Sequence, residues 1–133
     1  MTPQRPDAET IFHVLQRVAD VAGDPTSLIY ARLFATHPEL EPLFAMDRDG
    51  GVRASMVQTS IECILDHVGP DLTATNVISA ARLHHQGYGV PDGLFDAYWA
   101  AMTEAFQDIL TNEWTPDIDR AWRTLMAAFT AVT

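Results

Sequence analysis

Helix-breaking residues divide this sequence into short amphipathic segments, and this pattern constrains the fold more than any other feature. Between the breakers, apolar residues recur at intervals of three and four, which is the spacing of one face of an α-helix. No segment shows the sustained alternation of apolar and polar residues that is typical of a half-buried β-strand. The sequence therefore predicts an all-α fold of about six to eight helices in a single domain, residues 1–133.

The N-terminal part of the chain predicts two helices. Asp7 is positioned to cap the first, whose apolar face comprises Ile11, Val14, Leu15, Val18 and Val21. Asp24 and Pro25 then predict a second start, with proline at the first helical position. This helix is expected to stop near Pro38, since a residue before proline disfavours the helical conformation. Its apolar residues are Leu28, Ile29, Leu33 and Phe34.

The rest of the chain continues the same pattern. Its predicted segments are a short helix or turn over residues 38–44, a loop over 47–51, and helices over about 52–68, 72–86, 91–110 and 116 to near the end. Thr115 and Pro116 repeat the combination of a capping residue and a first-turn proline. Helices of such unequal length favour an irregular packing over a simple four-helix bundle.

Composition excludes several classes of function. The formal net charge is −10, and all eight basic residues are arginine, so lysine chemistry such as Schiff-base catalysis is excluded. No basic stripe is available to neutralise phosphates, which argues against nucleic acid as a partner. The single cysteine, Cys63, excludes an internal disulfide and fits a reducing compartment. Without a long apolar run, the sequence predicts a soluble cytoplasmic protein with no membrane partner.

Two adjacent histidines are the first candidate site residues. His84 and His85 end a helical stretch just before a glycine-rich turn. Imidazole is the commonest metal ligand among side chains and holds the iron in many haem proteins. Neighbouring helical residues point about 100° apart, so only one of the two can face a single metal ion. The alternative is that both are surface or capping residues at a helix C-terminus, where cationic side chains are favoured.

Tyr30 is the second candidate, because it interrupts an otherwise apolar helix face. A buried phenol needs a hydrogen-bond partner. It is therefore either a core tyrosine that donates to a backbone carbonyl or a donor that points into a ligand pocket. Motifs for zinc, for an EF-hand calcium loop, for phosphate loops and for a Ser-His-Asp triad are lacking from the sequence.

Three segments together resemble a known family. The segment Tyr30 to Met46 has a tyrosine, then a phenylalanine, then His-Pro-Glu and a Leu-Phe pair. The segment His85 to Val90 has a histidine followed five residues later by valine, and an Ala-Trp pair ends at Trp122. All three are similar, in this order, to segments of the bacterial single-domain haemoglobins (Vitreoscilla type) and of the globin domain of flavohaemoglobins.

The resemblance implies a globin fold around haem b (iron protoporphyrin IX). By this likeness His85 would be the proximal iron ligand, Phe44 the aromatic ring that wedges against the porphyrin, and Tyr30 the distal donor to a bound ligand. The other residues implied around the haem are Val52 and Met56 on the distal side, Val90 and Phe95 on the proximal side, and His84 at the haem edge. By position alone, the candidate partners of the haem propionates are Arg48, Arg53, Arg82 and His84.

Two departures from the family affect the expected chemistry. Valine stands at position 52, where the family usually has a polar residue such as glutamine, so Tyr30 is expected to be the main direct distal donor. Phenylalanine stands at position 95, where flavohaemoglobins have a tyrosine that bonds the proximal imidazole. This group, which would make the imidazole more electron-rich, is therefore missing from its usual place.

The resemblance implies reversible binding of a diatomic gas (O₂, NO or CO), in oxygen binding and transport or in NO handling. Two alternatives stay open at this point. One is a nitric oxide dioxygenase that works with a separate reductase, and the other is a haem-less globin-fold sensor or interaction module. A homodimer is one oligomeric state that the sequence leaves open.

Overall fold

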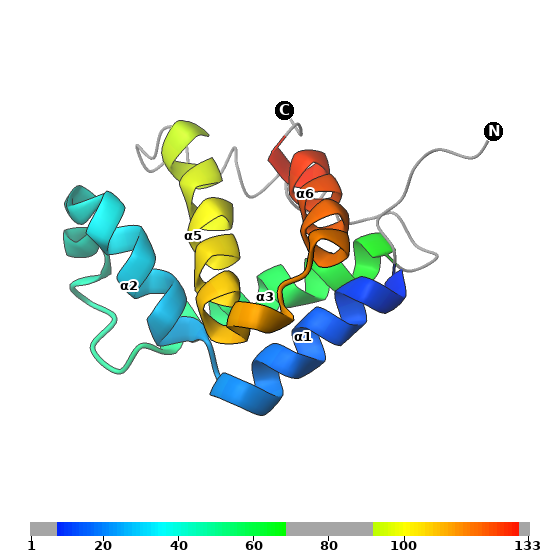
Figure 1. Cartoon of the computed structure of the whole chain (residues 1–133). Coiled ribbons are helices and arrows are strands. Elements are labelled where there is room, and N and C mark those ends of the chain that lie inside the picture. The colour runs from blue at the N-terminus through cyan, green and yellow to red at the C-terminus, as the bar shows by residue number, and fades with distance from the viewer. Residues whose placement is uncertain (1–7, 69–91, 131–133) are drawn as a thin grey trace.

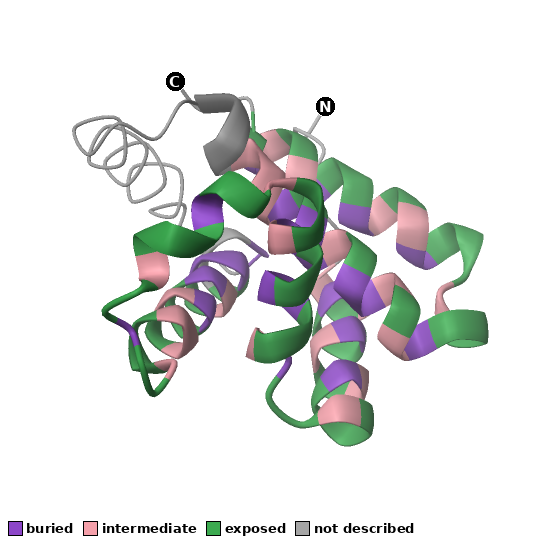
Figure 2. Cartoon of the chain, turned by 90° about the vertical axis from the view of Figure 1, so that its left-hand side faces the viewer, coloured by how far each residue is buried: buried purple, intermediate pink, exposed green. Residues whose placement is uncertain are grey.

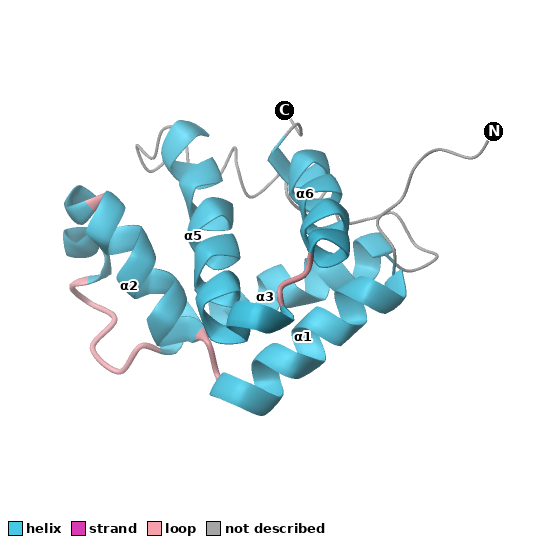
Figure 3. Ribbon diagram, viewed as in Figure 1, coloured by secondary structure: helices cyan, strands magenta, loops and turns pink. Residues whose placement is uncertain are grey.

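The computed structural model describes residues 8–68 and 92–130, of which 66–67 and 92–95 are described by their backbone alone. Its elements, in chain order, are α1 (Ala8–Ala22), α2 (Thr26–Thr36), η1 (Pro38–Phe44), α3 (Gly51–Val68), α5 (Asp92–Leu110), η2 (Thr111–Glu113) and α6 (Pro116–Thr130). Across these two ranges the chain forms helices joined by loops and no strand (Figure 3). The prediction of an all-α fold is thereby confirmed.

Helix α5 is the central element of the described part of the molecule. It packs against α1, α2 and α6, and the 3₁₀ helix η1 folds back against α2 (Figure 1). Helix α3 contacts both α1 and α2. Residues of α2, η1, α3 and α5 can therefore meet on one side of α5, while α6 covers another side of it.

The core follows the spacing of apolar residues along each helix. Buried positions face inward from every α-helix (Figure 2), because the three- and four-residue spacing places them on one side. The largest fully buried side chains are Trp122, Phe106, Phe129, Ile11, Ile29, Ile64, Met102, Leu110, Leu125 and Val14. Two positions assigned to apolar faces are exposed instead, namely Val21 and Leu28. The expectation that these two residues join the core is therefore wrong.

Helix starts agree with the sequence to within one residue. Thr115 caps α6 as predicted, since its Oγ1 accepts the Ile118 N–H at 3.3 Å. Helix α2 begins at Thr26, one residue later than expected, and Pro25 is its capping position. Asp24 accepts the Thr26 N–H at 3.0 Å, so its carboxylate still supports the start of the helix.

Other expected boundaries also agree with the structure. Helix α2 ends at Thr36, directly before the His37-Pro38 step, and the loop expected over 47–51 ends where Gly51 begins α3. Gly50 has a φ of +77°, a conformation that glycine adopts without strain. The capping role of Asp7 and the helix expected over about 72–86 lie outside the described residues.

Candidate functional site

Tyr30 is enclosed by aromatic rings rather than by backbone carbonyls. Its side chain is 2% exposed on the inner face of α2. The ring packs edge-to-face on Phe44 with centroids 5.3 Å apart, and it also contacts Phe34 at 5.7 Å and Tyr98 at 5.9 Å. Offset and edge-to-face arrangements at these separations are favourable for aromatic pairs. The sequence-predicted residues Tyr30 and Phe44 are thus brought together in one aromatic cluster.

Phe44 closes this cluster from the end of η1. It contacts Phe34 as well as Tyr30, with centroids 5.6 Å apart, and it is only half-buried. Proline at the start of η1 and a second proline within it favour the short 3₁₀ turn that carries the ring back over α2. One side of this ring is therefore fixed by packing, while part of it stays accessible.

Met56 supplies the hydrogen-bond partner of the Tyr30 hydroxyl. The Tyr30 Oη donates to the Met56 Sδ at 3.6 Å, from α2 to the adjacent helix α3. A thioether sulfur is only a weak acceptor. The first alternative considered for Tyr30 is corrected in one respect: the phenol is buried, but its partner is a side-chain sulfur and not a backbone carbonyl. The second, a donor to a ligand, stays a prediction.

A second hydroxyl chain adjoins this pair. Ser60, one turn beyond Met56, donates its Oγ to the Met56 carbonyl oxygen at 2.8 Å. The Tyr98 hydroxyl of α5 lies 2.8 Å from the same Oγ, and since the serine proton is used, Tyr98 is the donor in that contact. The structure thus joins α3 and α5 through two buried polar residues beside Tyr30.

Burial controls the protonation of both phenols. The pKa of Tyr30 is raised above its usual value of 10, chiefly because removal from water disfavours the phenolate. The pKa of Tyr98 is raised for the same principal reason, and the hydrogen bond with Ser60 opposes that rise. Both side chains are therefore neutral hydrogen-bond donors at neutral pH.

Asp47 fixes the first turn of α3. Its carboxylate is buried and accepts the N–H groups of Val52 at 2.9 Å and Arg53 at 3.0 Å. The Arg53 Nε also donates to it at 3.0 Å. These contacts, the Val52 N–H first among them, lower the pKa of Asp47. Arg53 is thereby committed to Asp47. Of the two propionate candidates that the structure describes, this leaves Arg48, which is exposed on the preceding loop.

The remaining predicted site residues fall into two groups. The first group is Val52, which the structure places at the start of α3, outside the aromatic cluster around Tyr30. Its side chain is 57% exposed. His84, His85 and Val90 lie outside the described residues, as does the side chain of Phe95, whose backbone belongs to α5. Their roles remain predictions, and so does the place of Val52 on the distal side.

Sequence reasoning missed Ser60 and Tyr98. Ser60 is not among the candidates from the sequence, yet it is buried and makes two hydrogen bonds. The signal was present in the spacing: Ser60 follows Met56 by four residues and therefore shares its helix face. Tyr98 lies four residues before the buried Met102 on α5, so it too could have been placed near the core.

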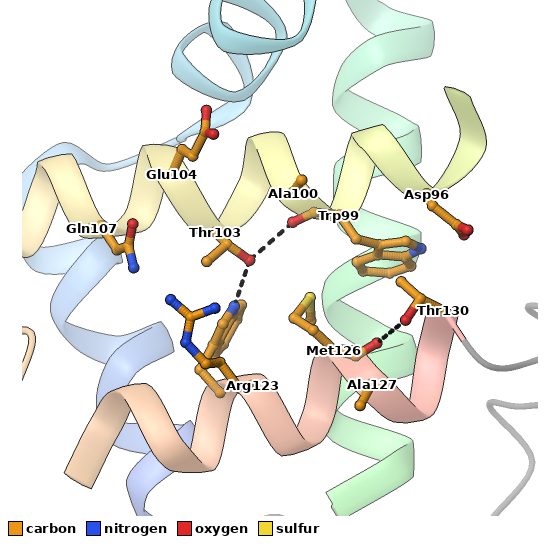
Figure 4. A pocket seen from close by; sticks show the side chains of 11 residues that line it. Asp96, Trp99, Ala100, Thr103, Glu104, Gln107, Arg123, Met126, Ala127 and Thr130 are labelled. Carbon is orange, nitrogen blue, oxygen red and sulfur yellow. Dashed lines mark hydrogen bonds between the residues drawn. The ribbon is translucent and has the colours of Figure 1, made fainter. Parts of the chain in front are cut away.

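A separate hollow of about 500 Å³ lies between α5 and α6, on another side of α5 (Figure 4). Its lining residues include Trp99, Thr103, Trp122 and Met126. Thr103 accepts the Trp122 Nε1–H at 2.8 Å and donates to the Trp99 carbonyl at 3.0 Å. This hollow contains none of the residues that the sequence singled out as ligand-binding.

The described residues contain neither a metal-binding cluster nor a membrane-spanning helix. Within residues 8–68 and 92–130, no group of three or more His, Cys, Asp or Glu side chains is arranged to hold a metal ion. In the same part of the chain no helix is long and apolar enough to cross a membrane.

Comparison with known families agrees with the geometry. The family model described as Globin matches residues 27–133, which is most of the chain and includes every residue of the aromatic cluster. No curated protein matches this sequence.

Proposed function

This chain belongs to the globin family, and we propose that it holds haem b and reversibly binds a diatomic gas, with O₂ the first candidate and NO the second. Globins typically bind haem and, through it, diatomic gases. The observation that carries the proposal is the enclosed Tyr30 hydroxyl, which is neutral, buried and bonded only weakly to the Met56 sulfur. Such a donor is available to a stronger acceptor that enters the same apolar space.

The residues that surround this space fit the distal side of a haem. Phe44 and Phe34 supply apolar rings, and Met56 adds a polarisable side chain that adapts to an irregular surface. A surface of this kind excludes water and leaves Tyr30 as the main donor. Val52, one turn before Met56, would border the distal side without donating a hydrogen bond.

The proximal side is assigned from the sequence. Haem, when bound, supplies the iron at which the gas binds, and His85 would hold that iron through a neutral imidazole. Val90 and Phe95 would pack against the same side, with His84 at the haem edge. Phe95 cannot donate to or accept from the imidazole, which favours a ligand-binding role over a strongly activated catalytic one.

Hemin titration of two neighbouring variants tests the proximal assignment. We expect His85→Ala to lose the normal coordination spectrum, because an alanine cannot ligate iron. His84→Ala is the matched control and should keep that spectrum, with at most weaker uptake. A wild-type protein that takes up no hemin would contradict the whole proposal. If His84→Ala lost the spectrum and His85→Ala kept it, His84 would be the iron ligand.

The dissociation rate of O₂ tests the distal assignment. A hydrogen bond to a strongly polarised acceptor contributes roughly 1.5–3 kcal/mol, so Tyr30→Phe should speed O₂ release about ten-fold or more. Flash photolysis or stopped-flow mixing measures this rate. An unchanged rate would mean that another group holds the ligand.

Catalysed turnover separates the ligand-binding role from the dioxygenase alternative. The holoprotein would be supplied with O₂, NO and an artificial electron donor, and nitrate would be measured over time. We expect little more than one equivalent of nitrate per haem. Sustained turnover would instead assign nitric oxide dioxygenase activity and would require a separate reductase as partner.

A further inference from the structure

The Tyr30 hydroxyl points at a sulfur atom in the structure. Its Oη donates to the Met56 Sδ at 3.6 Å, and the ring is held in place by Phe34 and Phe44. Because the ring contacts Phe34, Phe44 and Tyr98, its orientation is restricted, and so is the position of its hydroxyl. The sulfur is the acceptor that the fold provides for it, and it is a weak one.

The turn of α3 that carries Met56 is tied to α5. Ser60 bonds to the Met56 carbonyl, and Tyr98 bonds to Ser60, each at 2.8 Å. The Tyr98 ring also packs against the Tyr30 ring, with centroids 5.9 Å apart. The two phenols and the backbone turn that carries Met56 are therefore held close to one another by contacts from α2, α3 and α5.

Among the described residues, the two charged groups that act on the Tyr30 hydroxyl do not impose a strong field on it. Arg53 favours the phenolate of Tyr30 and Asp47 disfavours it, and these two residues are paired with each other at 3.0 Å. Because opposite charges at this distance largely cancel, the donor strength of the Tyr30 hydroxyl is governed by its immediate acceptor.

We propose that Met56 is a specificity-determining residue, whose sulfur competes with the bound gas for the Tyr30 hydroxyl. The inference rests on the proposed function. Ligand binding must break the contact between Tyr30 and Met56 before the hydroxyl can donate to the ligand. The apparent affinity for the gas is then lower, in proportion to the fraction of molecules in which the Met56 sulfur already holds the hydroxyl. Bound O₂ is strongly polarised and accepts a hydrogen bond from the freed hydroxyl, which offsets the free energy lost on breaking the contact with Met56. CO is a poorer acceptor, so its affinity does not depend on the hydroxyl.

The contact can be tested without a haem. In the full-length protein labelled with ¹³C at the methionine methyl groups, Tyr30→Phe should shift the Met56 methyl resonance. Met46, which is 89% exposed, and Met102, which is fully buried, serve as internal controls whose resonances stay in place. A Met56 resonance that does not move would overturn the inference even if the protein binds haem normally.

Gas affinities test the consequence. A weak neutral hydrogen bond lies at the lower end of roughly 0.5–1.5 kcal/mol, so Met56→Leu should raise the affinity for O₂ about two- to five-fold and leave that for CO almost unchanged. The same substitution in a Tyr30→Phe background should leave the O₂ to CO ratio unaltered, because no hydroxyl remains to be released. Met102→Leu is the matched control for exchanging a methionine elsewhere in the core.

The outcomes separate the inference from the proposed function. Failure to take up hemin contradicts the proposed function and appears before any gas is added. Equal gains for O₂ and CO in Met56→Leu would indicate a change of space around the ligand, and this would overturn the competition by the sulfur. A lower or unchanged O₂ affinity in a variant that binds haem would overturn it as well.

Discussion

Tyr98 and Trp99 are neighbours on α5, yet their polar groups have opposite surroundings. The Tyr98 hydroxyl bonds to Ser60 of α3 and stands beside Tyr30. The Trp99 ring packs on Phe129 of α6 with centroids 4.9 Å apart, and its buried Nε1 has no hydrogen-bond partner in the part of the chain that the structure describes. Helix α5 thus separates a side with linked hydroxyl groups from a side where large rings pack beside a hollow.

The difference assigns separate roles to the two sides of α5. On the α6 side the large rings mostly fill space, and the shared Thr103 ties Trp122 to the backbone of α5. On the α3 side a chain of hydroxyl groups and one sulfur leads to a phenol without a strong acceptor. We therefore expect substitutions on the α6 side to change the free energy of unfolding most, and those on the α3 side to change ligand binding most.

The largest expected effect is on the packed side. Trp122 is fully buried, so Trp122→Ala should lower the free energy of unfolding by about 3–5 kcal/mol through lost apolar contact and the cavity it leaves. Urea unfolding of the two proteins measures the difference. Trp114→Ala is a suitable control, because that ring is only half-buried and should cost less. A loss no larger than that of Trp114→Ala would break the contrast between the two sides.

A smaller effect, with a pH dependence, is expected at the start of α3. Because bonds to the carboxylate lower the pKa of Asp47 in the folded chain, its contribution to stability is present above its ordinary value of 3.8. That contribution is lost as pH falls through the lower folded pKa. Asp47→Asn should therefore be less stable than wild type near pH 7, and the gap should close in acid.

Asp119 provides the comparison on the α6 side. Its carboxylate accepts from Trp114 and Arg123, which lower its pKa, but its side chain is 31% exposed, against 4% for Asp47. Solvent screening should make the effect of Asp119→Asn the smaller of the two. Unfolding midpoints of both variants and of the wild type, measured from pH 3 to 7, test this order. A larger pH-dependent loss of stability in Asp119→Asn than in Asp47→Asn would contradict it.

Much of the fold could be predicted because helix periodicity and breakers are local signals. The spacing of Ile11, Val14 and Val18 defines one buried face, and the Thr115-Pro116 pair marks a helix start that the structure confirms. The margins of the faces could not be predicted in this way. Whether Val21 or Leu28 is covered depends on where neighbouring helices pack, and periodicity does not report that.

The site was only partly predictable for a similar reason. Tyr30 and Phe44 are recognisable because they lie fourteen residues apart in one segment of known pattern. Their partner Met56 was placed on the distal side only through the resemblance, and the bond from Tyr30 to its sulfur depends on the contact between α2 and α3. Ser60 and Tyr98 are thirty-eight residues apart, so their bond follows from tertiary packing and from no local motif.

The smallest expected effect on stability concerns the Tyr98 hydroxyl. Tyr98→Phe keeps the ring and removes one buried hydrogen bond, so it should cost about 0.5–1.5 kcal/mol in urea unfolding. Ser60 keeps its bond to the Met56 carbonyl in this variant, which limits the damage to α3. The Met56 methyl resonance should nevertheless shift, because the turn of α3 that carries Met56 loses its tether to α5. A variant as unstable as Trp122→Ala would show that this hydroxyl supports the core, and the two sides of α5 would then differ less than their contacts suggest.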